Sequence, residues 1–285
     1  MPKVIVITGT STGLGLALAV QLAGRGHRVH ATMRNLDKRA ALDAAAAGAG
    51  VTLEVSRLDV QDTASVETAI GAILAAEGRI DTLVNNAGGG FVRSTEQASE
   101  AQIAQVLDLN LMGAIRCTKA VLPAMRRARS GHVINISSVG GLVGQPFNEI
   151  YCAAKFAIEG YTESLASYMT PSFGINFSAV EPGGISTEFV TTIMSEVQAT
   201  GGVIEDEYKP ILEAYLGGAR RRGGSSNAHQ TADEAAAPIV GVVEATDPPV
   251  RIRTSAWAEE FTRLKTAADP DGKRLQRQVI ERFLS

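Results

Sequence analysis

Short apolar segments alternate with longer segments of helical periodicity over the first two thirds of the chain. The short segments are rich in Val, Ile and Leu at successive positions. This is typical of strands buried on both faces, since a strand with one exposed face would alternate polar and apolar side chains. The predicted strands are Val4–Ile7, Arg28–Thr32, Val51–Val55, Asp81–Val84, Val133–Ser137 and Ile175–Val180.

Segments long enough to form helices connect these strands. The predicted helices end at about Arg25, begin at about Leu36, span about Thr63–Ala76 and Glu149–Met169, and include two more between the fourth and fifth strands. Strands joined by right-handed helical crossovers form a parallel sheet that is covered on both faces. We therefore predict an α/β fold, a doubly wound, Rossmann-like parallel sheet of about seven strands.

The pattern becomes irregular after Pro182. Residues 186–230 contain two predicted helical pieces and a stretch rich in Gly, Arg and Ser, after which a helix at about Thr231–Ala245 and a seventh strand at Val250–Arg253 follow. No linker rich in Pro and Ser divides the chain, so residues 1–285 are predicted to form one domain. A long excursion beside the carboxyl ends of parallel strands is typical of a substrate lid, which we place at 186–230.

The composition narrows the class of protein. Of 285 residues, 45% are hydrophobic and the net charge is −3. These values exclude an intrinsically disordered chain and predict no nucleic-acid partner, because such a partner selects a basic surface. The chain begins directly with a strand, and no apolar run reaches the roughly 18 residues of a membrane helix. We expect a cytoplasmic protein with no membrane partner and, because its four histidines and two cysteines lack ligand spacing, no metal site.

A glycine-rich turn lies between the first predicted strand and the first helix. Its pattern is TGxxxGxG, which differs from the GxxxxGK[ST] pattern of nucleotide triphosphatases. Glycine lets the chain turn sharply and lets a diphosphate approach the N–H groups at the start of a helix. The predicted cofactor contacts here are Gly9, Thr10, Ser11, Thr12, Gly13, Leu14 and Gly15.

Further motifs follow in a characteristic order. They are Asn85–Gly88 after the fourth strand, Asn110 on a later helix, Ser138 after the fifth strand, Tyr151–Lys155 at the start of a long helix, and Pro182–Gly183 after the sixth strand. In this order the chain resembles the short-chain dehydrogenase/reductase family, in its compact single-domain branch, over about residues 3–190. The resemblance implies an oxidoreductase that acts on CH–OH groups with a nicotinamide cofactor.

Tyr151 and Lys155 lie four residues apart and therefore on one helix face. A free phenol has a pKa near 10, and an adjacent ammonium group lowers it because the cation stabilises the phenolate. We predict that Tyr151 is the general acid/base, which protonates a carbonyl oxygen in reduction and deprotonates an alcohol in oxidation.

The resemblance implies roles for the other motif residues. Lys155 would also bind the nicotinamide ribose, Ser138 would hydrogen-bond the substrate oxygen, and Asn110 would help to hold a proton-relay water. The further cofactor contacts it implies are Asp59, Val60, Asn86, Ala87, Gly88, Pro182, Gly183, Ile185 and Thr187. Two alternatives remain open, since Asp59 also fits a local turn and Thr187 a helix N-cap.

The residue after the second strand bears on the choice of cofactor. An acidic residue at the end of that strand is typical of NAD binding, but this chain has Met33 followed by Arg34. A guanidinium can bind a 2′-phosphate through two hydrogen bonds. We therefore predict NADP(H) over NAD(H); the alternative is that Arg34 is merely solvated.

The predicted substrate is an apolar carbonyl compound or alcohol. Segments 89–91 and 140–147 and the lid after Ile185 are expected to face it. They contribute Leu142, Val143, Phe147, Phe189, Ile193 and Met194 and few charges, although these side chains also fit ordinary core contacts. More loosely, the chain looks like family members that act on steroids, retinoids or bulky ketones.

The predicted partner is a second copy of the chain. Family members associate through the helices that carry Asn110 and Tyr151, so a homodimer or homotetramer is expected.

Three rival functions fit the residues less well. A cofactor-binding regulatory or scaffold protein would not need the complete set Asn110, Ser138, Tyr151 and Lys155. A sugar-nucleotide epimerase or dehydratase usually has TGxxGxxG and a larger C-terminal domain, and an enoyl reductase usually separates its tyrosine and lysine further.

Overall fold

Seven parallel strands form the central sheet, in the order β3-β2-β1-β4-β5-β6-β9. The computed structural model describes residues 2–185, 195, 197–198, 201–223 and 229–283. The strands are β1 Val4–Thr8, β2 Arg28–Met33, β3 Glu54–Arg57, β4 Thr82–Asn85, β5 Gly131–Ile136, β6 Ile175–Glu181 and β9 Arg251–Arg253. Strand order reverses between β1 and β4, which is the signature of a doubly wound sheet. The predicted Rossmann-like fold is confirmed.

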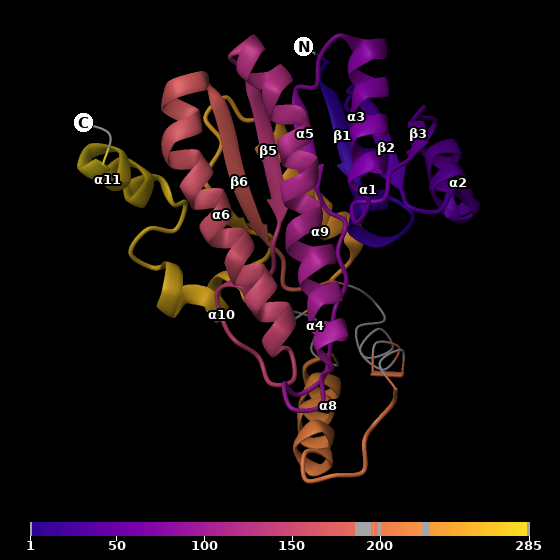
Figure 1. The fold of residues 1–285 in the computed structure, drawn as a ribbon, viewed down its shortest axis with the longest axis vertical. Helices are drawn as coiled ribbons and strands as arrows, with labels where there is room; N and C mark the ends of the chain where they lie inside the picture. The colour runs from indigo at the N-terminus through magenta and orange to yellow at the C-terminus, as the bar shows by residue number, and fades with distance from the viewer. Residues whose placement is uncertain (1, 186–194, 196, 199–200, 224–228, 284–285) are drawn as a thin grey trace.

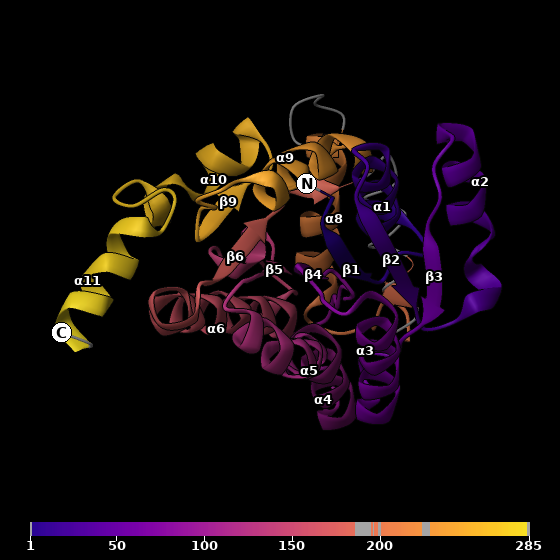
Figure 2. The same ribbon diagram turned by 90° about the horizontal axis from the view of Figure 1, so that it is seen from above.

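Helices cover both faces of this sheet (Figures 1 and 2). In Figure 2, α3, α5 and α6 lie on one face, and α1 and α9 on the other. The helices are α1 Gly13–Gly24, α2 Ala40–Ala49, α3 Thr63–Glu77, α4 Glu100–Leu107, α5 Gly113–Ala128, α6 Glu149–Phe173, α8 Lys209–Gly223, α9 Ala232–Glu244, α10 Ala256–Thr266 and α11 Lys273–Phe283. Within the part of the chain that the structure describes, none of these helices has the length and apolar character needed to cross a membrane.

The first strand shows why the apolar segments predict a sheet buried on both faces. Ile5 and Ile7 pack in one core cluster with Leu18 and Leu22 of α1. Val6, on the opposite face of the same strand, packs in the second cluster beneath α3, α5 and α6. Each side of the sheet therefore has its own hydrophobic core, and β1 contributes to both.

The third strand is displaced from its prediction. The sequence predicts Val51–Val55, but β3 is Glu54–Arg57, paired with β2 alone. Gly50 ends α2 in the left-handed conformation, and the N–H of Val51 still bonds to the carbonyl of Ala46. The β-branched residues at 51 and 52 therefore belong to the C-terminal cap of α2. Hydrogen bonding to β2 begins only at Glu54, where the chain reaches the edge of that strand.

The segment after β6 adds a feature that the sequence did not predict. β7 (Gly184–Ile185) and β8 (His229–Gln230) form a separate two-stranded parallel sheet. One of the two predicted helical pieces of this region is α8. Residues 186–194, 196, 199–200 and 224–228 of the proposed lid, and with them Thr187, Phe189, Ile193 and Met194, lie outside the described residues.

Leu18→Ala is expected to lower the free energy of unfolding by about 2–5 kcal/mol, because the side chain fills the core between α1 and the sheet and its removal leaves a cavity. Leu18 is 0% exposed, whereas Leu264 on α10 is 99% exposed and provides the control. Leu264→Ala should change the free energy by less than about 0.5 kcal/mol. Equilibrium urea unfolding measures both, and equal effects would contradict this packing.

Candidate active site

The turn after β1 leaves no room for a side chain at two of its glycines, Gly9 and Gly15. Gly9 has φ +72°, and a Cβ there would lie 2.8 Å from the Cα of Ala87. A Cβ on Gly15 would overlap the carbonyl oxygen of Gly9 and the side-chain nitrogen of Asn86. The Thr12 side chain caps none of the first N–H groups of α1. These N–H groups therefore suit an anion such as a diphosphate.

The loop after β4 supports this turn. The Asn86 side-chain amide donates to the carbonyls of Thr8 (2.9 Å) and Gly9 (3.0 Å). The hydroxyl of Thr8 accepts from the backbone N–H groups of Asn86 and Ala87, each at 3.0 Å. The carboxyl ends of β1 and β4 are thus tied together, and Asn86 has a structural role in addition to its predicted cofactor contact.

Asn110 lies in a π-helical segment, Asp108–Met112, between α4 and α5. Its side-chain oxygen accepts from the N–H of Gly89 (3.1 Å), and its nitrogen donates to the carbonyls of Gly89 (3.0 Å) and Val106 (3.1 Å). The side chain therefore holds the loop at Gly88–Gly89 against the helix. Irregular π turns of this kind are frequent at functional sites.

Tyr151 and Lys155 lie on the same face of α6, with the Lys155 nitrogen 5.6 Å from the centre of the Tyr151 ring. Lys155 is buried and donates to the carbonyl oxygen of Ile136 at the end of β5 (2.9 Å). Burial lowers the pKa of Lys155 to about 8, and the neighbouring Glu159 opposes this shift. A cation therefore lies beside the phenol, as the spacing predicts.

Ser138 follows β5 and is half-buried. Its hydroxyl oxygen accepts from the N–H of Gly140 (3.0 Å) in a short 3₁₀ turn, Val139–Gly141. Because this bond uses the oxygen as acceptor, the hydroxyl hydrogen can be donated to another group.

A cleft of about 780 Å³ joins these elements. Of the predicted residues, those that line it are Leu14, Asn86, Gly88, Asn110, Ser138, Tyr151, Lys155, Pro182, Gly183 and Ile185. Of the segments predicted to face the substrate, Gly89, Gly90 and residues 143–146 also line it. Phe147 does not, because it is buried with Leu212 and Leu216 beneath α8, which fits the alternative of a core contact.

The predicted contacts near the adenine end lie outside the lining of this cleft. Arg34 is exposed directly after β2. The Asp59 carboxylate accepts from the N–H of Gln61 (3.1 Å), so it forms the local turn that the sequence left open. Val60 is buried against the start of α5. A Cβ on Gly113 would lie 2.8 Å from the Val60 side chain, so the two segments are in close contact.

Sequence reasoning missed an aromatic wall of the cleft. Trp257 and Phe261 of α10 line it, with their rings stacked at 4.8 Å between centres. Tyr215 of α8 lines it too, and its hydroxyl accepts from the Asn148 side chain (3.0 Å). The four-residue spacing of Trp257 and Phe261 places them on one helix face, and that was the available signal.

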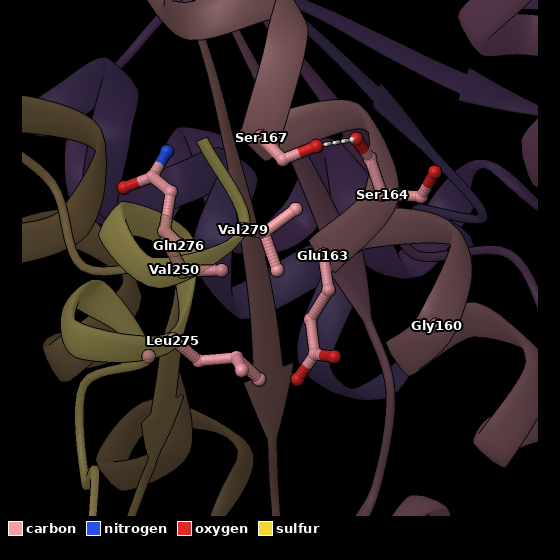
Figure 3. A pocket seen from close by; sticks show the side chains of 9 residues that line it. Gly160, Glu163, Ser164, Ser167, Val250, Leu275, Gln276 and Val279 are labelled. Atoms are coloured by element: carbon pink, nitrogen blue, oxygen red, sulfur yellow. Dashed lines mark hydrogen bonds between the residues drawn. The ribbon is translucent and has the colours of Figure 1, made fainter. Parts of the chain in front are cut away.

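A smaller pocket of about 290 Å³ lies between α6 and α11. Figure 3 shows Glu163 of α6 facing Leu275 and Val279 of α11 across it. None of the predicted catalytic residues lines this pocket, so the larger cleft is the candidate active site.

Comparisons with known proteins indicate the family to which the chain belongs. The short chain dehydrogenase family model matches residues 3–198. The chain is 42% identical over 271 residues to retinol dehydrogenase 8 of Homo sapiens, covering 93% of this chain and 85% of that protein. It is 37% identical over 280 residues to 17-beta-hydroxysteroid dehydrogenase type 1 of Mus musculus, covering 95% and 78% respectively.

A solved structure extends the agreement to the fold. The short-chain dehydrogenase from Streptomyces avermitilis superimposes with a TM-score of 0.76 at 29% identity, over 99% of this chain and 96% of that chain. The family model includes the glycine-rich turn, Ser138, Tyr151 and Lys155 within its matched residues. The chain therefore belongs to the short-chain dehydrogenase family.

Proposed function

We propose that this protein is an NADP(H)-dependent oxidoreductase that interconverts a carbonyl group and an alcohol of an apolar substrate. The observation that carries the proposal is the position of Ser138, Tyr151 and Lys155 in one cleft that also reaches Leu14, at the end of the glycine-rich turn. Retinol dehydrogenase 8 and 17-beta-hydroxysteroid dehydrogenase type 1, two relatives that match most of this chain, are named for oxidation of alcohols.

The residues present fit a dinucleotide. The crowded glycines at 9 and 15 let a diphosphate approach the backbone at the start of α1. Lys155, buried one helical turn from Tyr151, can donate to ribose hydroxyls through the hydrogens that Ile136 does not use. When bound, the nicotinamide supplies the hydride in reduction or accepts it in oxidation.

Tyr151 moves the proton in this proposal. In reduction its phenol protonates the carbonyl oxygen, and in oxidation its phenolate takes the proton of the alcohol. The Lys155 ammonium beside the ring stabilises the phenolate, so that a phenol can exchange its proton near neutral pH. Ser138 donates a hydrogen bond to the substrate oxygen, where negative charge develops during the reaction.

The lining of the cleft supports an apolar substrate. Val143, Trp257 and Phe261 provide apolar surface beside the polar groups of Ser138 and Tyr151. A pocket that is mostly apolar, with a few placed polar groups, orients a hydrophobic molecule by its one reactive group. The named substrates of the two relatives, a retinol and a steroid, are of this kind.

Three further proposals complete the assignment. Exposed Phe156 and Tyr168 on α6 support self-association into a homodimer or homotetramer through the α5 and α6 face. We place the protein in the cytoplasm. We also propose a single catalytic domain over 1–285, in which residues 186–230 form a substrate lid.

Tyr151→Phe is expected to reduce kcat by about 10²–10⁴-fold, because it removes the proton-transferring hydroxyl. NADPH affinity should stay within about threefold, because the ring and Lys155 remain. Tyr168→Phe, an exposed position on the same helix, is the control. NADPH oxidation with a panel of bulky ketones and steroids, together with NADPH fluorescence titration, measures both quantities. Near-normal turnover of Tyr151→Phe would refute the mechanism.

Gly15→Ala is expected to weaken NADPH binding at least about tenfold, because its methyl group forces the turn away from Gly9 and Asn86. Gly160→Ala is the matched control, since a Cβ on Gly160 meets nothing within 4 Å. Isothermal titration with NADPH compares the two variants. Equal affinities for both variants and the parent protein would show that the turn does not hold the cofactor.

Arg34→Asp is expected to shift the ratio of kcat/KM for NADPH over NADH toward NADH by about 10–100-fold, since it replaces a phosphate-binding cation with a repelling anion. Arg277→Asp on α11 makes the same charge change on an exposed residue of a helix that does not line the cleft. Steady-state kinetics with both cofactors gives the ratios. An unchanged ratio in Arg34→Asp would locate the selective contact elsewhere.

A further inference from the structure

Two carboxyl groups lie buried behind the catalytic residues. Glu159 of α6 is 6% exposed and Glu181, the last residue of β6, is 0% exposed. A Cβ on Gly141 would lie 2.5 Å from the Ser137 hydroxyl oxygen and 3.0 Å from Glu159 Oε1, so these two groups are neighbours. The N–H of Ser137 bonds to the carbonyl of Val180, the residue before Glu181 (2.7 Å), and the two carboxyl groups influence each other's pKa. Glu159 follows Lys155 by one helical turn, and Ser137 immediately precedes Ser138. The pair therefore adjoins the two elements that carry the proposed catalytic residues.

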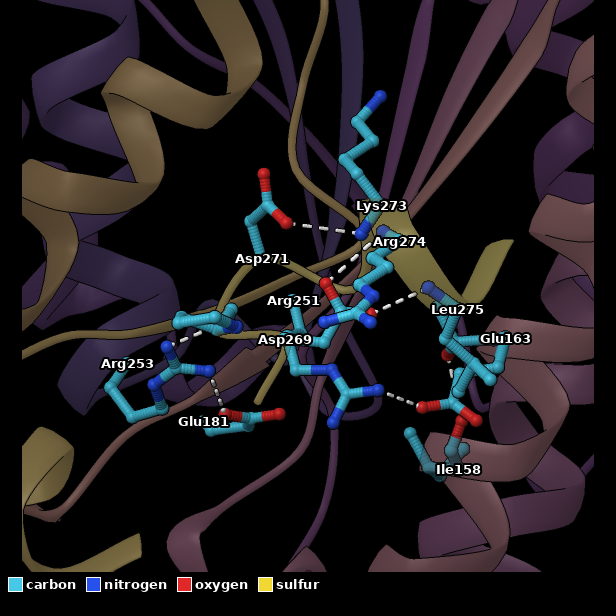
Figure 4. Close-up of polar contacts among 12 residues, drawn as sticks. Ile158, Glu163, Glu181, Arg251, Arg253, Asp269, Asp271, Lys273, Arg274 and Leu275 are labelled. Carbon is cyan, nitrogen blue, oxygen red and sulfur yellow. Dashed lines mark hydrogen bonds and ion pairs between the residues drawn. The ribbon is translucent and has the colours of Figure 1, made fainter. Parts of the chain in front are cut away.

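Charged groups approach this pair from every neighbouring element. They are Lys155 and Glu163 on α6, Arg251 and Arg253 on β9, and Glu259 on α10. Figure 4 shows Arg253 bonded to Glu181 and Arg251 bonded to Glu163. Arg253 also forms an ion pair with Glu259, 3.0 Å between the nearest atoms. Both guanidinium groups thus have carboxylate partners, and neither is hydrogen-bonded to Glu159.

If both carboxyl groups of the pair ionise, the negative charges in this group of side chains outnumber the positive charges by one. Among the described residues, one oxygen of Glu159 and one of Glu181 have no hydrogen-bond partner. A buried unpaired carboxylate is costly, whereas one proton shared by two neighbouring carboxyl groups removes one of the two buried negative charges. Burial raises the pKa of Glu159 well above its usual value, and burial raises that of Glu181 to about 7 against the opposing effect of Arg253.

The charge of Glu159 acts on Lys155. Burial disfavours the ammonium form of Lys155, and Glu159 is the neighbouring charge that favours it. The fixed partner of the ammonium group is a neutral carbonyl, that of Ile136. A negative charge that develops on the carboxyl pair as pH rises would therefore retain the Lys155 proton to higher pH.

We propose that Glu159 and Glu181 share one proton, and that Glu159 is a positioning residue which, on loss of that proton, keeps Lys155 cationic in alkaline solution. The shared proton is a property of the fold. Its effect on turnover rests on the proposed function. The two parts need separate measurements, so that failure of one is distinguishable from failure of the other.

Infrared difference spectroscopy between about pH 6 and about pH 9 tests the shared proton without substrate or cofactor. The parent protein should lose the C=O stretch of a protonated carboxyl as pH rises. Glu159→Gln and Glu181→Gln should each lack this change. Glu67→Gln, at an exposed position of α3, should retain it. Persistence of the band change in both of the first two variants, or its absence from the parent protein, would overturn the proposal.

The pH profile of kcat/KM with NADPH tests the effect on Lys155. Below about pH 7, Glu159→Gln should stay within about twofold of the parent protein, because glutamine resembles the protonated acid. Its alkaline limb should move down by about one pH unit, since Lys155 loses its counter-charge. Glu67→Gln should leave the limb in place. An unmoved limb, or an equal loss at every pH in a variant with parental Tm, would overturn the role of Glu159.

Discussion

The close approach of the turn after β1 to the loop after β4 is the constraint on which the site depends. Thr8 accepts two backbone N–H groups of that loop, and the Asn86 side chain donates to two carbonyls of the turn. Each of these groups would cost about 1–3 kcal/mol if it were buried without a partner. The bonds therefore hold the segments so close that a side chain at Gly15 is excluded, and the start of α1 stays open to an anion.

The second constraint is a buried cation. Lys155 is held by the carbonyl oxygen at the end of β5, on the face of α6 that also carries Tyr151. Burial makes its ammonium group less stable but strengthens its effect on the neighbouring phenol, because both lie in a medium of low dielectric constant. The polar groups behind it, Glu159 and Glu181, belong to the same low-dielectric interior. The proposed catalytic side chains and the buried carboxyl groups therefore lie on adjoining elements.

The two parts of the chain contribute differently to the cleft. The segment matched by the family model, 3–198, contains the glycine-rich turn and the proposed catalytic side chains. The segment after it contributes Tyr215, Trp257 and Phe261. These aromatic side chains form part of the cleft wall that a substrate would contact. Such a division lets one reaction centre serve different substrates, because the shape of the wall varies independently of the reacting groups.

Local patterns were sufficient for much of the molecule. Continuous apolar segments predict strands buried on both faces, and the two-sided packing of Ile5, Val6 and Ile7 is the physical reason. A four-residue separation places Tyr151 and Lys155 on one face of a helix wherever that helix lies. The glycine pattern likewise predicts the turn, because only glycine allows its positive φ and close contacts.

Tertiary structure decided what depends on segments far apart in the sequence. The start of β3 follows from its edge pairing with β2, and Trp257 reaches the cleft because α10 packs beside Gly183. Arg253 meets Glu181 because β9 adds to the edge of β6, across 72 residues of sequence. No local sequence pattern predicts such contacts, since periodicity gives the direction of a side chain but not the element that it faces. The sequence alone therefore determined the sheet and the proposed reacting groups, whereas the fold determined the wall of the cleft and the charges behind it.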